Sequence, residues 1–374
     1  MTSTNTSIVF LGNGRCFHTM DWFRSAQKYT PGQPPLLITD LIDGESFEKL
    51  TTSDDRVEEL LVLDRILFSK QTRFGNIWRN IVKLLVLPWQ IVRLRRILRQ
   101  YARPVIHAHS MYYIMLARFS GCKYVATPQG SELLVRPYRS RLYRLFASIG
   151  LSRATEIVVD SVAMCKSLDE LFGLKATIIQ NGIDVGGIAT LQDELAQQKM
   201  TDSRPNIVSL RGFTPNYQID RLVDARNETA KDTPIHFCYP FEECEYKTVV
   251  SQKLSDGDHD LGRLSRMDLH MLLLRTRLVV SIPSSDSSPR SVYEAIFCGC
   301  FVAVTEGDWI NLLPPCMAAR VIVVDLHNRT WLREALEFAD ANARQPYIPS
   351  PQALDMYDQQ RSLTRYYHEV YPAA

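Results

Sequence analysis

Short apolar runs rich in β-branched residues alternate with amphipathic stretches along most of the chain. The first run, Ile8 to Leu11, ends in a glycine turn, and the run from Leu278 to Ile282 ends at Pro283. Runs of this kind are typical of strands buried in a parallel sheet. Further strands are predicted at residues 36–39, 105–110, 124–127, 156–160, 207–210, 301–304 and 319–324. Helices are predicted at residues 20–29, 77–99, 137–151, 291–299, 330–343 and 354–371.

This regular alternation predicts an α/β fold in which right-handed crossovers connect parallel strands. At 374 residues the chain is long enough for two domains with separate cores. Residues 185–205 are polar, so we predict a loop there. We place a first Rossmann-like domain at 1–190, a linker at 191–205 and a second domain at 206–345.

The composition excludes several classes of protein. The chain is 45% hydrophobic and 22% charged, as in ordinary globular proteins. No window of 18 uninterrupted apolar residues predicts a membrane span, and the polar start predicts no secretory signal peptide. The eight cysteines lack paired C-x-x-C or His/Cys ligand spacing, which favours buried thiols in a reducing cytoplasm over disulfides or zinc.

The stretch from Ser284 to Gly299 carries the clearest candidate chemistry. It consists of a polar loop after a strand, Ser284 to Pro289, and a short helix that ends at Gly299. Free amides of such a loop, together with a helix start, form an anion site. Glu294, one turn inside that helix, would bind something other than the anion, such as sugar hydroxyls. The stretch therefore predicts a nucleotide-sugar pocket, and the alternative is an ordinary strand–helix unit with an acidic helix start.

The same residues resemble the donor-site signature of glycosyltransferase family 4. In that family an acidic residue, seven intervening residues and a glutamate precede a helix ending in glycine, and Asp286 and Glu294 have this spacing. The resemblance implies that Glu294 holds the nucleotide ribose and that Asp286 lies near the transferred sugar. It also implies that the loop and helix start hold the donor phosphates. The donor-binding residues of this stretch are then Ser287, Ser288, Arg290, Ser291 and Glu294.

Other motifs follow the order of the same family, with two departures. The similar motifs are a His-Ala-His strand at 107–109, a Gly-Ser-acid turn at 130–132 and Asn-Gly-Ile-Asp at 181–184. Many relatives have histidine before that Gly-Ser turn, but Gln129 stands here and cannot relay a proton. Arg211, at a strand end, matches the arginine that contacts the pyrophosphate. The expected lysine is missing from 216–218, and Arg290 is a candidate substitute.

The resemblance also implies the two sides of the site. The turn at Gly12 and Gly14 lacks the third glycine and the acid of a dinucleotide fingerprint, so we assign it to the interdomain cleft, on the donor side. Gln129, Arg211, Asp286 and Glu294 form the catalytic set. His109, Ser131 and Glu132 lie on the acceptor side, although a lone histidine in a strand is more often structural.

Charge is distributed very unevenly along the sequence. Between residues 65 and 153 there are 17 Lys or Arg and one acid, Glu132, although the whole chain carries only +2. This predicts an anionic partner such as a membrane surface, and the alternative is a solvated basic surface. Residues 77–99 combine apolar, tryptophan and basic positions, so they could lie in a membrane interface or pack on the first domain. Pro88 is expected to split or kink this helix.

An acidic segment at 256–260 contains two D-x-D patterns. Metal-dependent glycosyltransferases of the other main fold place such a motif after an apolar strand, but polar residues precede it here. We therefore interpret it as a solvated loop and expect no metal site.

The whole pattern resembles the GT-B arrangement, two facing Rossmann-like domains with an interdomain cleft, completed by a C-terminal helix at 352–374 that returns to the first domain. It implies a retaining glycosyltransferase that uses a UDP- or GDP-sugar, needs no metal and acts on a glycan or lipid-linked acceptor. We expect no nucleic acid partner, and a cytoplasmic protein peripheral to the inner face of the membrane. Two alternatives remain: a non-catalytic GT-B subunit and a nucleotide-sugar epimerase.

Overall fold

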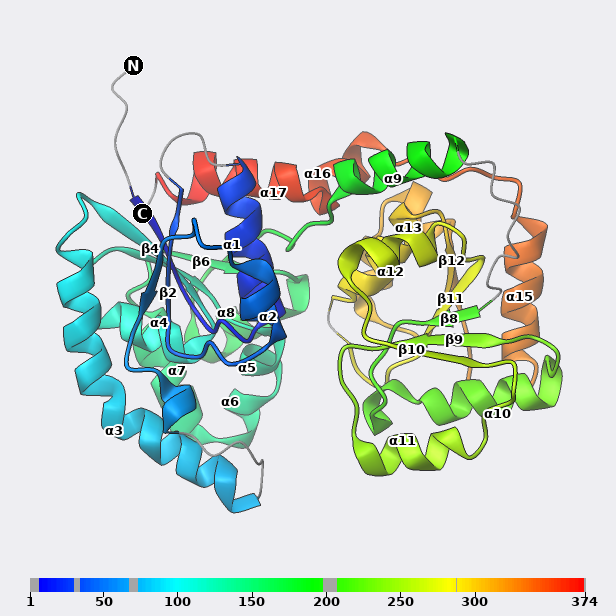
Figure 1. The fold of residues 1–374 in the computed structure, drawn as a ribbon, viewed down its shortest axis with the longest axis horizontal. Coiled ribbons are helices and arrows are strands. Elements are labelled where there is room, and N and C mark those ends of the chain that lie inside the picture. The colour runs from blue at the N-terminus through cyan, green and yellow to red at the C-terminus, as the bar shows by residue number, and fades with distance from the viewer. Residues whose placement is uncertain (1–6, 30–33, 67–72, 198–206, 287, 373–374) are drawn as a thin grey trace. The chain divides into compact units, whose positions relative to one another are not determined.

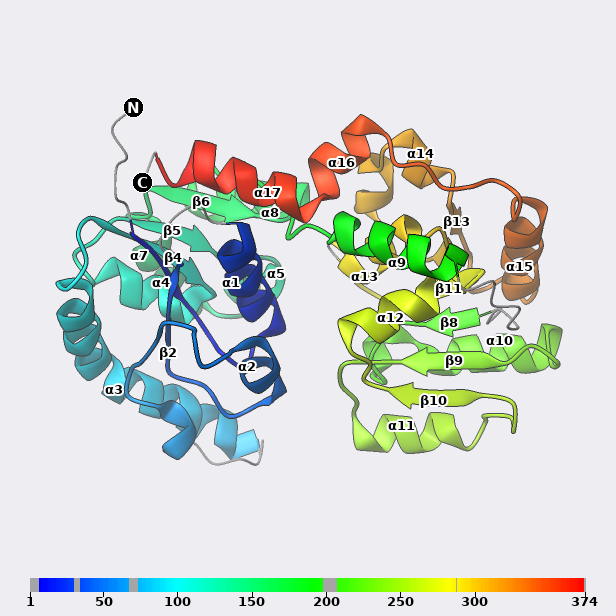
Figure 2. The same ribbon diagram turned by 45° about the horizontal axis from the view of Figure 1, so that its top comes forward.

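The computed structural model describes residues 7–29, 34–66, 73–197, 207–286 and 288–372. It divides into two compact units, Met1–Asn181 with Gln360–Ala374, and Gly182–Gln359. Each unit is a parallel sheet with helices on both faces (Figures 1 and 2).

The first unit is built on a seven-stranded sheet in the order β3-β2-β1-β4-β5-β6-β7. Its strands are β1 (Ser7–Leu11), β2 (Leu36–Thr39), β3 (Val57–Glu59), β4 (Pro104–His109), β5 (Tyr124–Thr127), β6 (Glu156–Val159) and β7 (Thr177–Ile178). Its helices are α1 (Phe17–Tyr29), α2 (Glu45–Leu50), α3 (Arg73–Leu98), α4 (Met111–Arg118), α5 (Gly130–Leu134), α6 (Arg136–Arg139), α7 (Arg141–Leu151) and α8 (Val162–Phe172).

Alternate residues of each strand in this sheet enter different cores. Val9 and Leu11 of β1 pack with residues of α3, α4, α7 and α8. Phe10, between them, packs with α1 and with the C-terminal segment. Both faces of the sheet are therefore buried, which explains why its strands are apolar without interruption.

The second unit has a six-stranded sheet in the order β10-β9-β8-β11-β12-β13. Its strands are β8 (Ile207–Ser209), β9 (Ile235–Cys238), β10 (His259–Gly262), β11 (Leu278–Ser281), β12 (Phe301–Val304) and β13 (Val321–Val323). Its helices are α9 (Val185–Gln197), α10 (Ile219–Thr229), α11 (Cys244–Ser251), α12 (Arg266–Leu273), α13 (Arg290–Phe297), α14 (Pro315–Ala318), α15 (Trp331–Ala341) and α16 (Pro351–Tyr357).

Two predictions about helices are wrong. Residues 185–197 form α9 and not a loop, and the rest of the predicted linker, 198–205, lies outside the described residues. The predicted helix 352–374 is divided into α16 and α17 (Gln359–Arg365), because Asp358 between them has an extended backbone. Helix α3 runs through Pro88 for 26 residues, so the proline does not split it, and the kink stays a prediction.

The C-terminal segment completes the first unit. After α17, residues Tyr366–Val370 form one wide helical turn. Tyr366 packs edge-on against Trp22 of α1, with ring centroids 4.8 Å apart, and the Tyr371 hydroxyl lies 2.8 Å from Nδ1 of His107. His107 is therefore structural.

In the part of the chain that is described, no helix is long and apolar enough to cross a membrane. All eight cysteines are free thiols, and only Cys244 is exposed. Three of them, Cys238, Cys298 and Cys300, are buried as predicted, and the other four are half-buried.

Candidate functional site

In the second unit, predicted site residues gather at the carboxyl ends of β8, β11 and β12. Strands β8 and β11 are neighbours at the centre of the sheet. From β8 the chain adds β9 and β10 toward one edge, and from β11 it adds β12 and β13 toward the other edge. Ligands of open parallel sheets bind where the strand order reverses in this way, here between β8 and β11. A cavity at this point is lined by Arg211, Ser281, Pro283, Ser284, Ser285, Asp286, Pro289, Val304, Thr305, Glu306 and Trp309.

Arg211 is fixed in this cavity by three neighbours. Its Nε donates to Ser281 Oγ at 2.6 Å, and its Nη2 donates to Asp286 Oδ2 at 2.8 Å. The guanidinium also lies 5.4 Å from the ring centre of Tyr217. Within the described residues its Nη1 has no hydrogen-bond partner, so the cation can still bind an anion while Asp286 holds it in place.

The segment that replaces the expected lysine holds the loop after β11. The Asn216 carbonyl oxygen accepts a hydrogen bond from the Ser284 N–H at 2.7 Å, and Asn216 Oδ1 accepts one from the Ser284 hydroxyl at 2.8 Å. The side-chain amide of Gln218 donates to the Ile282 carbonyl at 2.8 Å, and the backbone of Gln218 is left-handed. From the other side, the Thr305 hydroxyl donates to the Pro283 carbonyl at 2.8 Å. These bonds fix the shape of the loop.

Glu294 lies in α13, which begins at Arg290 and ends before Gly299, a residue with φ of +88°. Its carboxylate Oε1 lies 3.5 Å from Arg266 Nη2, 3.7 Å from Arg290 Nε and 3.9 Å from His270 Nε2. The last distance is too long for a direct hydrogen bond, so we treat His270 as an electrostatic neighbour. Burial alone would raise the pKa of Glu294, but His270, Arg290 and Arg266 together lower it to about 2.

This environment differs from that of an exposed carboxylate at a helix start. The residue is 7% exposed and already has cationic partners. Its proposed role toward a ribose therefore depends on Arg266 and Arg290 as well. Both arginines come from segments that surround the same end of the sheet, α12 and α13.

The remaining predicted residues of the loop are only partly described. Ser287 lies outside the described residues. Ser288 accepts a backbone bond from Arg290 at 3.0 Å, and Ser291 is half-buried in the first turn of α13. Arg290 points its Nε toward Glu294, which does not support our suggestion that it replaces the missing lysine.

In the first unit, Gly12 and Gly14 occupy the turn after β1 and are buried. A Cβ added to Gly12 would lie 2.5 Å from Thr19 Cγ2 and 3.3 Å from His109 Cβ. One added to Gly14 would lie 2.5 Å from the Leu41 carbonyl oxygen. Both glycines are therefore required by close packing of the turn against its neighbours.

His109 ends β4 beside this turn and stacks on Phe10 at 5.8 Å. Burial, and then the neighbouring His18, lowers its pKa to about 3. The ring is therefore neutral at neutral pH. Its Nε2 is buried and has no hydrogen-bond partner among the described residues, so this nitrogen could bind a ligand group only if the turn beside it opened.

Glu132, which we assigned to the acceptor side, is buried and bonded to the backbone. Its Oε2 accepts from Met111 N at 2.9 Å and from Gln129 N at 3.0 Å, which joins the starts of α4 and α5. Burial raises its pKa, and these bonds only partly offset that effect. Gln129 and Ser131 are exposed, and the Gln129 amide lies 3.4 Å from Cys16 Sγ. Of this group, Gln129 and Ser131 are available to a substrate.

The acidic segment 256–260 is not the solvated loop that we expected. The Asp258 side chain is 1% exposed and forms a two-fold ion pair with the fully buried Arg226. Asp258 also accepts backbone bonds from Ile235 and Ser255, both at 2.8 Å. The segment leads into edge strand β10 and has a structural role. No group of acidic, histidine or cysteine residues suited to a metal occurs in the described residues.

Sequence reasoning missed Asn216, Gln218, Arg266 and His270. The first two carry no charge and lie where the family pattern has a lysine, so composition gave no signal for them. Arg266 and His270 lie four residues apart on α12, a spacing that puts them on one face of a helix. This spacing could have predicted that both residues contact one buried carboxylate, which in the structure is Glu294.

Comparison with known proteins gives one family match and several structures with the same fold. Residues 56–186 match the model of Glycosyltransferase Family 4. Among curated proteins, none matches the sequence of this chain. The structure of HepE from Anabaena in complex with UDP covers 98% of this chain and 100% of its own, with 15% identity and a TM-score of 0.72.

Two further structures share the fold over the whole chain. Sucrose-phosphate synthase from Thermosynechococcus elongatus has a TM-score of 0.72 at 12% identity, covering 98% of this chain and 100% of its own. The lipopolysaccharide outer core galactosyltransferase WaaB, in its apo form, has a TM-score of 0.63 at 10% identity, with the same coverage. Residues 56–186 therefore resemble glycosyltransferase family 4, and over nearly its whole length the chain shares the GT-B fold with these structures.

Proposed function

We propose that this enzyme transfers a sugar from a UDP- or GDP-sugar to a glycan or lipid-linked acceptor, with retention of anomeric configuration. The acceptor belongs to cell-surface polysaccharide synthesis, such as that of lipopolysaccharide. The cavity between the ends of β8 and β11, with Arg211 in it, carries the proposal. The complexes of HepE with UDP and with UDP-glucose support a nucleotide-sugar donor, and within our proposal they favour a uridine nucleotide.

In this proposal Arg211 binds the diphosphate of the donor through Nη1, which has no hydrogen-bond partner among the described residues. The amides of the 284–291 segment and the start of α13 add hydrogen bonds to the same phosphates. As the sugar leaves, charge grows on the diphosphate, and these fixed donors stabilise it without reorganisation. Asp286, bonded to Arg211, lies beside the transferred sugar and keeps the guanidinium oriented.

Glu294 accepts hydrogen bonds from the ribose hydroxyls. Its pKa of about 2 keeps it ionised at neutral pH, so these bonds are charge-assisted. The acceptor hydroxyl loses its proton to an oxygen of the departing phosphate, and Gln129 hydrogen-bonds the donor. Gln129 has no proton to relay, so it positions the donor without acting as acid or base.

The first unit binds the acceptor, and Gln129 and Ser131 are its available polar groups. The basic region 65–153 associates with anionic lipid, which makes the enzyme cytoplasmic and peripheral to the inner face of the membrane. No resident metal is needed in this scheme, because cationic side chains and amides take the phosphate charge.

A screen of nucleotide sugars by thermal shift, followed by transfer assays with the best donor, tests the proposal. A specific ligand at a hundredfold over its Kd raises the stability by about 2.7 kcal/mol. We expect one UDP- or GDP-sugar to raise Tm, and nucleotide release to continue in EDTA when acceptor is present. Binding without transfer to any acceptor would favour the non-catalytic subunit, and conversion of the free UDP-sugar would favour the epimerase.

A further inference from the structure

The outward face of α3 is apolar, which is unusual for a surface helix. Its buried face, with Val82, Leu94 and Ile97, packs on the first unit. The opposite face exposes Trp78 (42%), Ile81 (44%), Leu84 (60%), Leu85 (70%), Trp89 (76%) and Val92 (57%). These positions recur at intervals of three or four residues and form a continuous stripe along the helix. A stripe of this size on a surface marks a site of interaction with a partner or a membrane.

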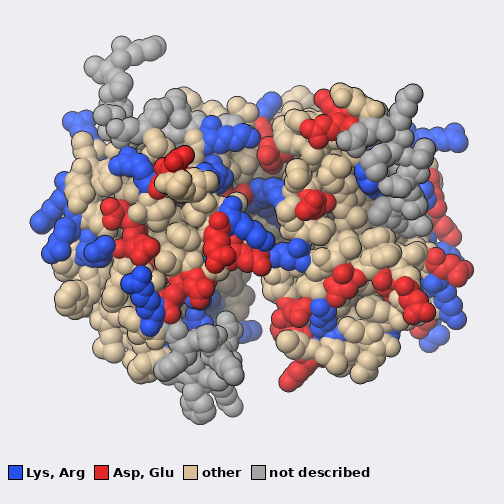
Figure 3. Space-filling view, viewed as in Figure 1, with Lys and Arg blue, Asp and Glu red and all other residues tan. Residues whose placement is uncertain are grey.

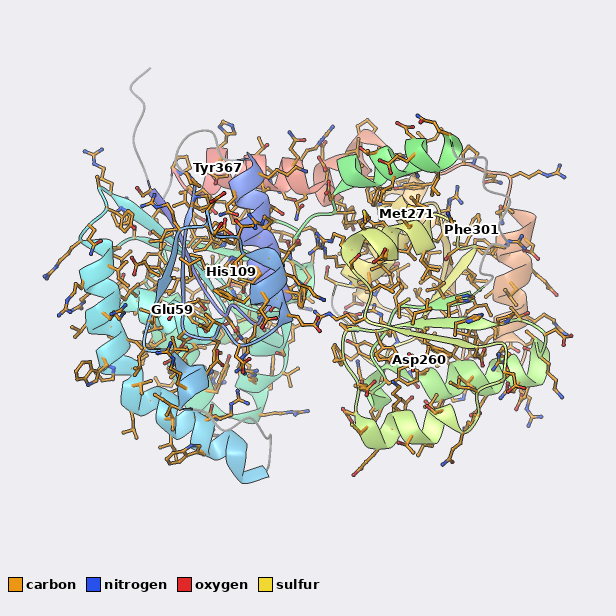
Figure 4. All side chains as sticks on the ribbon, in the orientation of Figure 1. Glu59, His109, Asp260, Met271, Phe301 and Tyr367 are labelled. Carbon is orange, nitrogen blue, oxygen red and sulfur yellow. The ribbon has the colours of Figure 1, made fainter. Side chains whose placement is uncertain are left out.

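A hollow lies at the C-terminal half of this stripe. It has a volume of about 380 Å³ and separates α3 from the segment that follows β3. Its lining consists of Glu59, Leu60, Leu61, Val62, Arg65, Trp89, Val92, Arg93 and Arg96. Figure 4 labels Glu59 on the side of the first unit where α3 lies. The walls are mostly apolar and the charged groups are mostly arginines.

The three arginines of the hollow have no carboxylate partner in the described part of the chain. Arg93 donates its Nε to the Glu59 carbonyl at 2.8 Å, which fixes its guanidinium at the rim. Arg65 and Arg96 are exposed and form no ion pair with any described residue. Figure 3 shows basic side chains gathered over this end of α3. With one glutamate against three arginines, the hollow has an excess of positive charge.

We propose that this hollow binds the phosphate of an anionic membrane lipid, with the stripe of α3 inserted among the headgroups beside it. The arginines match the charge of a phosphate, and Trp89 and Val92 match the glycerol and acyl region next to it. A free phosphate would gain nothing from apolar walls, and a protein partner would not need a helix whose charged residues are all basic. The inference rests on the membrane association proposed above and not on the identity of the sugar donor.

Cosedimentation with vesicles tests the hollow against a general effect of charge. The probes are vesicles of phosphatidylcholine with one third phosphatidylglycerol, at physiological salt. The double variant Arg65→Ser with Arg96→Ser removes two charges of the hollow. The control, Lys123→Ser with Arg153→Ser, removes two exposed charges that precede β5 and β6 and do not line the hollow.

We expect the hollow variant to bind roughly thirtyfold more weakly and the control to bind like the parent, since each basic residue at an anionic surface contributes roughly a factor of five. Equal losses in the two variants would overturn the hollow as a site. Equal binding of the parent to pure phosphatidylcholine would overturn the anionic lipid. Displacement of the protein by inorganic phosphate at matched ionic strength would assign the hollow to a free anion.

Tryptophan quenching locates the contact. Trp89 is the most exposed of the described tryptophans. Lipids brominated in the acyl chain should therefore quench the tryptophan fluorescence of the parent and of the Trp78→Phe variant, and should quench that of the Trp89→Phe variant much less. Unchanged quenching in Trp89→Phe would exclude the hollow from the interface. Sugar transfer to a soluble acceptor should be the same in the parent and the hollow variant. Absence of transfer in the parent would contradict the proposed function, whereas equal vesicle binding of the parent and the hollow variant would contradict the lipid site.

Discussion

Glu294 shows how little a sequence reveals about the surroundings of a candidate residue. The spacing to Asp286 predicted a ribose contact, but a sequence cannot show that Arg266, Arg290 and His270 surround the carboxylate.

Replacing Glu294 with Gln removes the charge from the ribose bonds. We expect donor affinity to fall at least roughly tenfold, because a hydrogen bond to a charged group contributes about 1.5–3 kcal/mol. Calorimetric titration of folded variant and parent with the donor measures this.

The same variant should also lose stability, and the loss should depend on pH. The folded pKa of Glu294 is about 2, below the ordinary 4.5, so its ionisation stabilises the fold on the order of 3 kcal/mol above pH 4.5. That contribution disappears as the pH falls from about 4.5 to 2. The Tm difference between parent and Glu294→Gln should therefore shrink over this range. A difference that stays constant from neutral pH to pH 2 would mean that the cationic cluster does not stabilise the carboxylate.

Asp258 gives a prediction about stability alone. Its removal leaves Arg226 charged, buried and unpaired, and breaking such a pair costs about 3–5 kcal/mol. Asp258→Ala should lower the free energy of unfolding in urea by that amount, while the folded fraction keeps its donor affinity. Asp256→Ala, an exposed acid two residues earlier, is the matched control and should change little. Equal unfolding midpoints for the two variants would show that the ion pair is not important to the fold.

At the scale of elements, the loop after β11 depends on the 3₁₀ turn Pro215–Tyr217 and on Gln218. Asn216→Ala removes the side-chain bonds to Ser284 and Ser285, each contributing about 0.5–1.5 kcal/mol. We expect donor affinity to fall about three- to tenfold with little change in Tm, measured by the same titration. Asn342→Ala, which loses a comparable bond to the Phe338 carbonyl far from the loop, should bind the donor like the parent. Parent-like affinity of Asn216→Ala would separate the turn from the site.

The elements themselves were predictable to different degrees. The central strands and α13 were found because long apolar runs and glycine stops are local signals. Strands β3 and β7 were missed because they have only three and two residues. Strand β9 was missed because His236 interrupts its apolar run, and β10 because it is the polar edge strand His259–Gly262. Helix α9 was missed because Gly186 and Gly187 suggest a loop. The helix begins there because the Asp184 carboxylate accepts the Gly187 N–H at 3.0 Å.

At the scale of the whole molecule, the alternation of strands and helices predicted two Rossmann-like units, but not where the chain leaves each one. The chain leaves the first unit after Asn181 and returns at Gln360. Nearby, Ile183 exchanges backbone bonds with Tyr357 and Gln359 at 2.7 and 2.9 Å. Such pairing involves residues far apart in sequence, so no local pattern contains it.

The returning segment should be essential to the first unit. Tyr366 is 1% exposed and lies between Trp22 and His107, so Tyr366→Ala should cost about 3–5 kcal/mol. Hydrogen exchange should speed up in β1, β4 and α1, and stay unchanged in β11 and α13. Equal acceleration in both units, or none, would contradict this division.

The account depends most on Arg211 at the switch point between β8 and β11. Titration of the parent, Arg211→Ala and Arg277→Ala with UDP and with the donor found in the screen tests it directly. Arg277 pairs with Asp340 just before β11 begins, at the opposite edge of the same sheet. We predict parent-like affinity for Arg277→Ala and at least a roughly tenfold loss for Arg211→Ala, since a charge-assisted contact contributes at least about 1.5 kcal/mol. Parent-like affinity of a folded Arg211→Ala variant would contradict a diphosphate at this site.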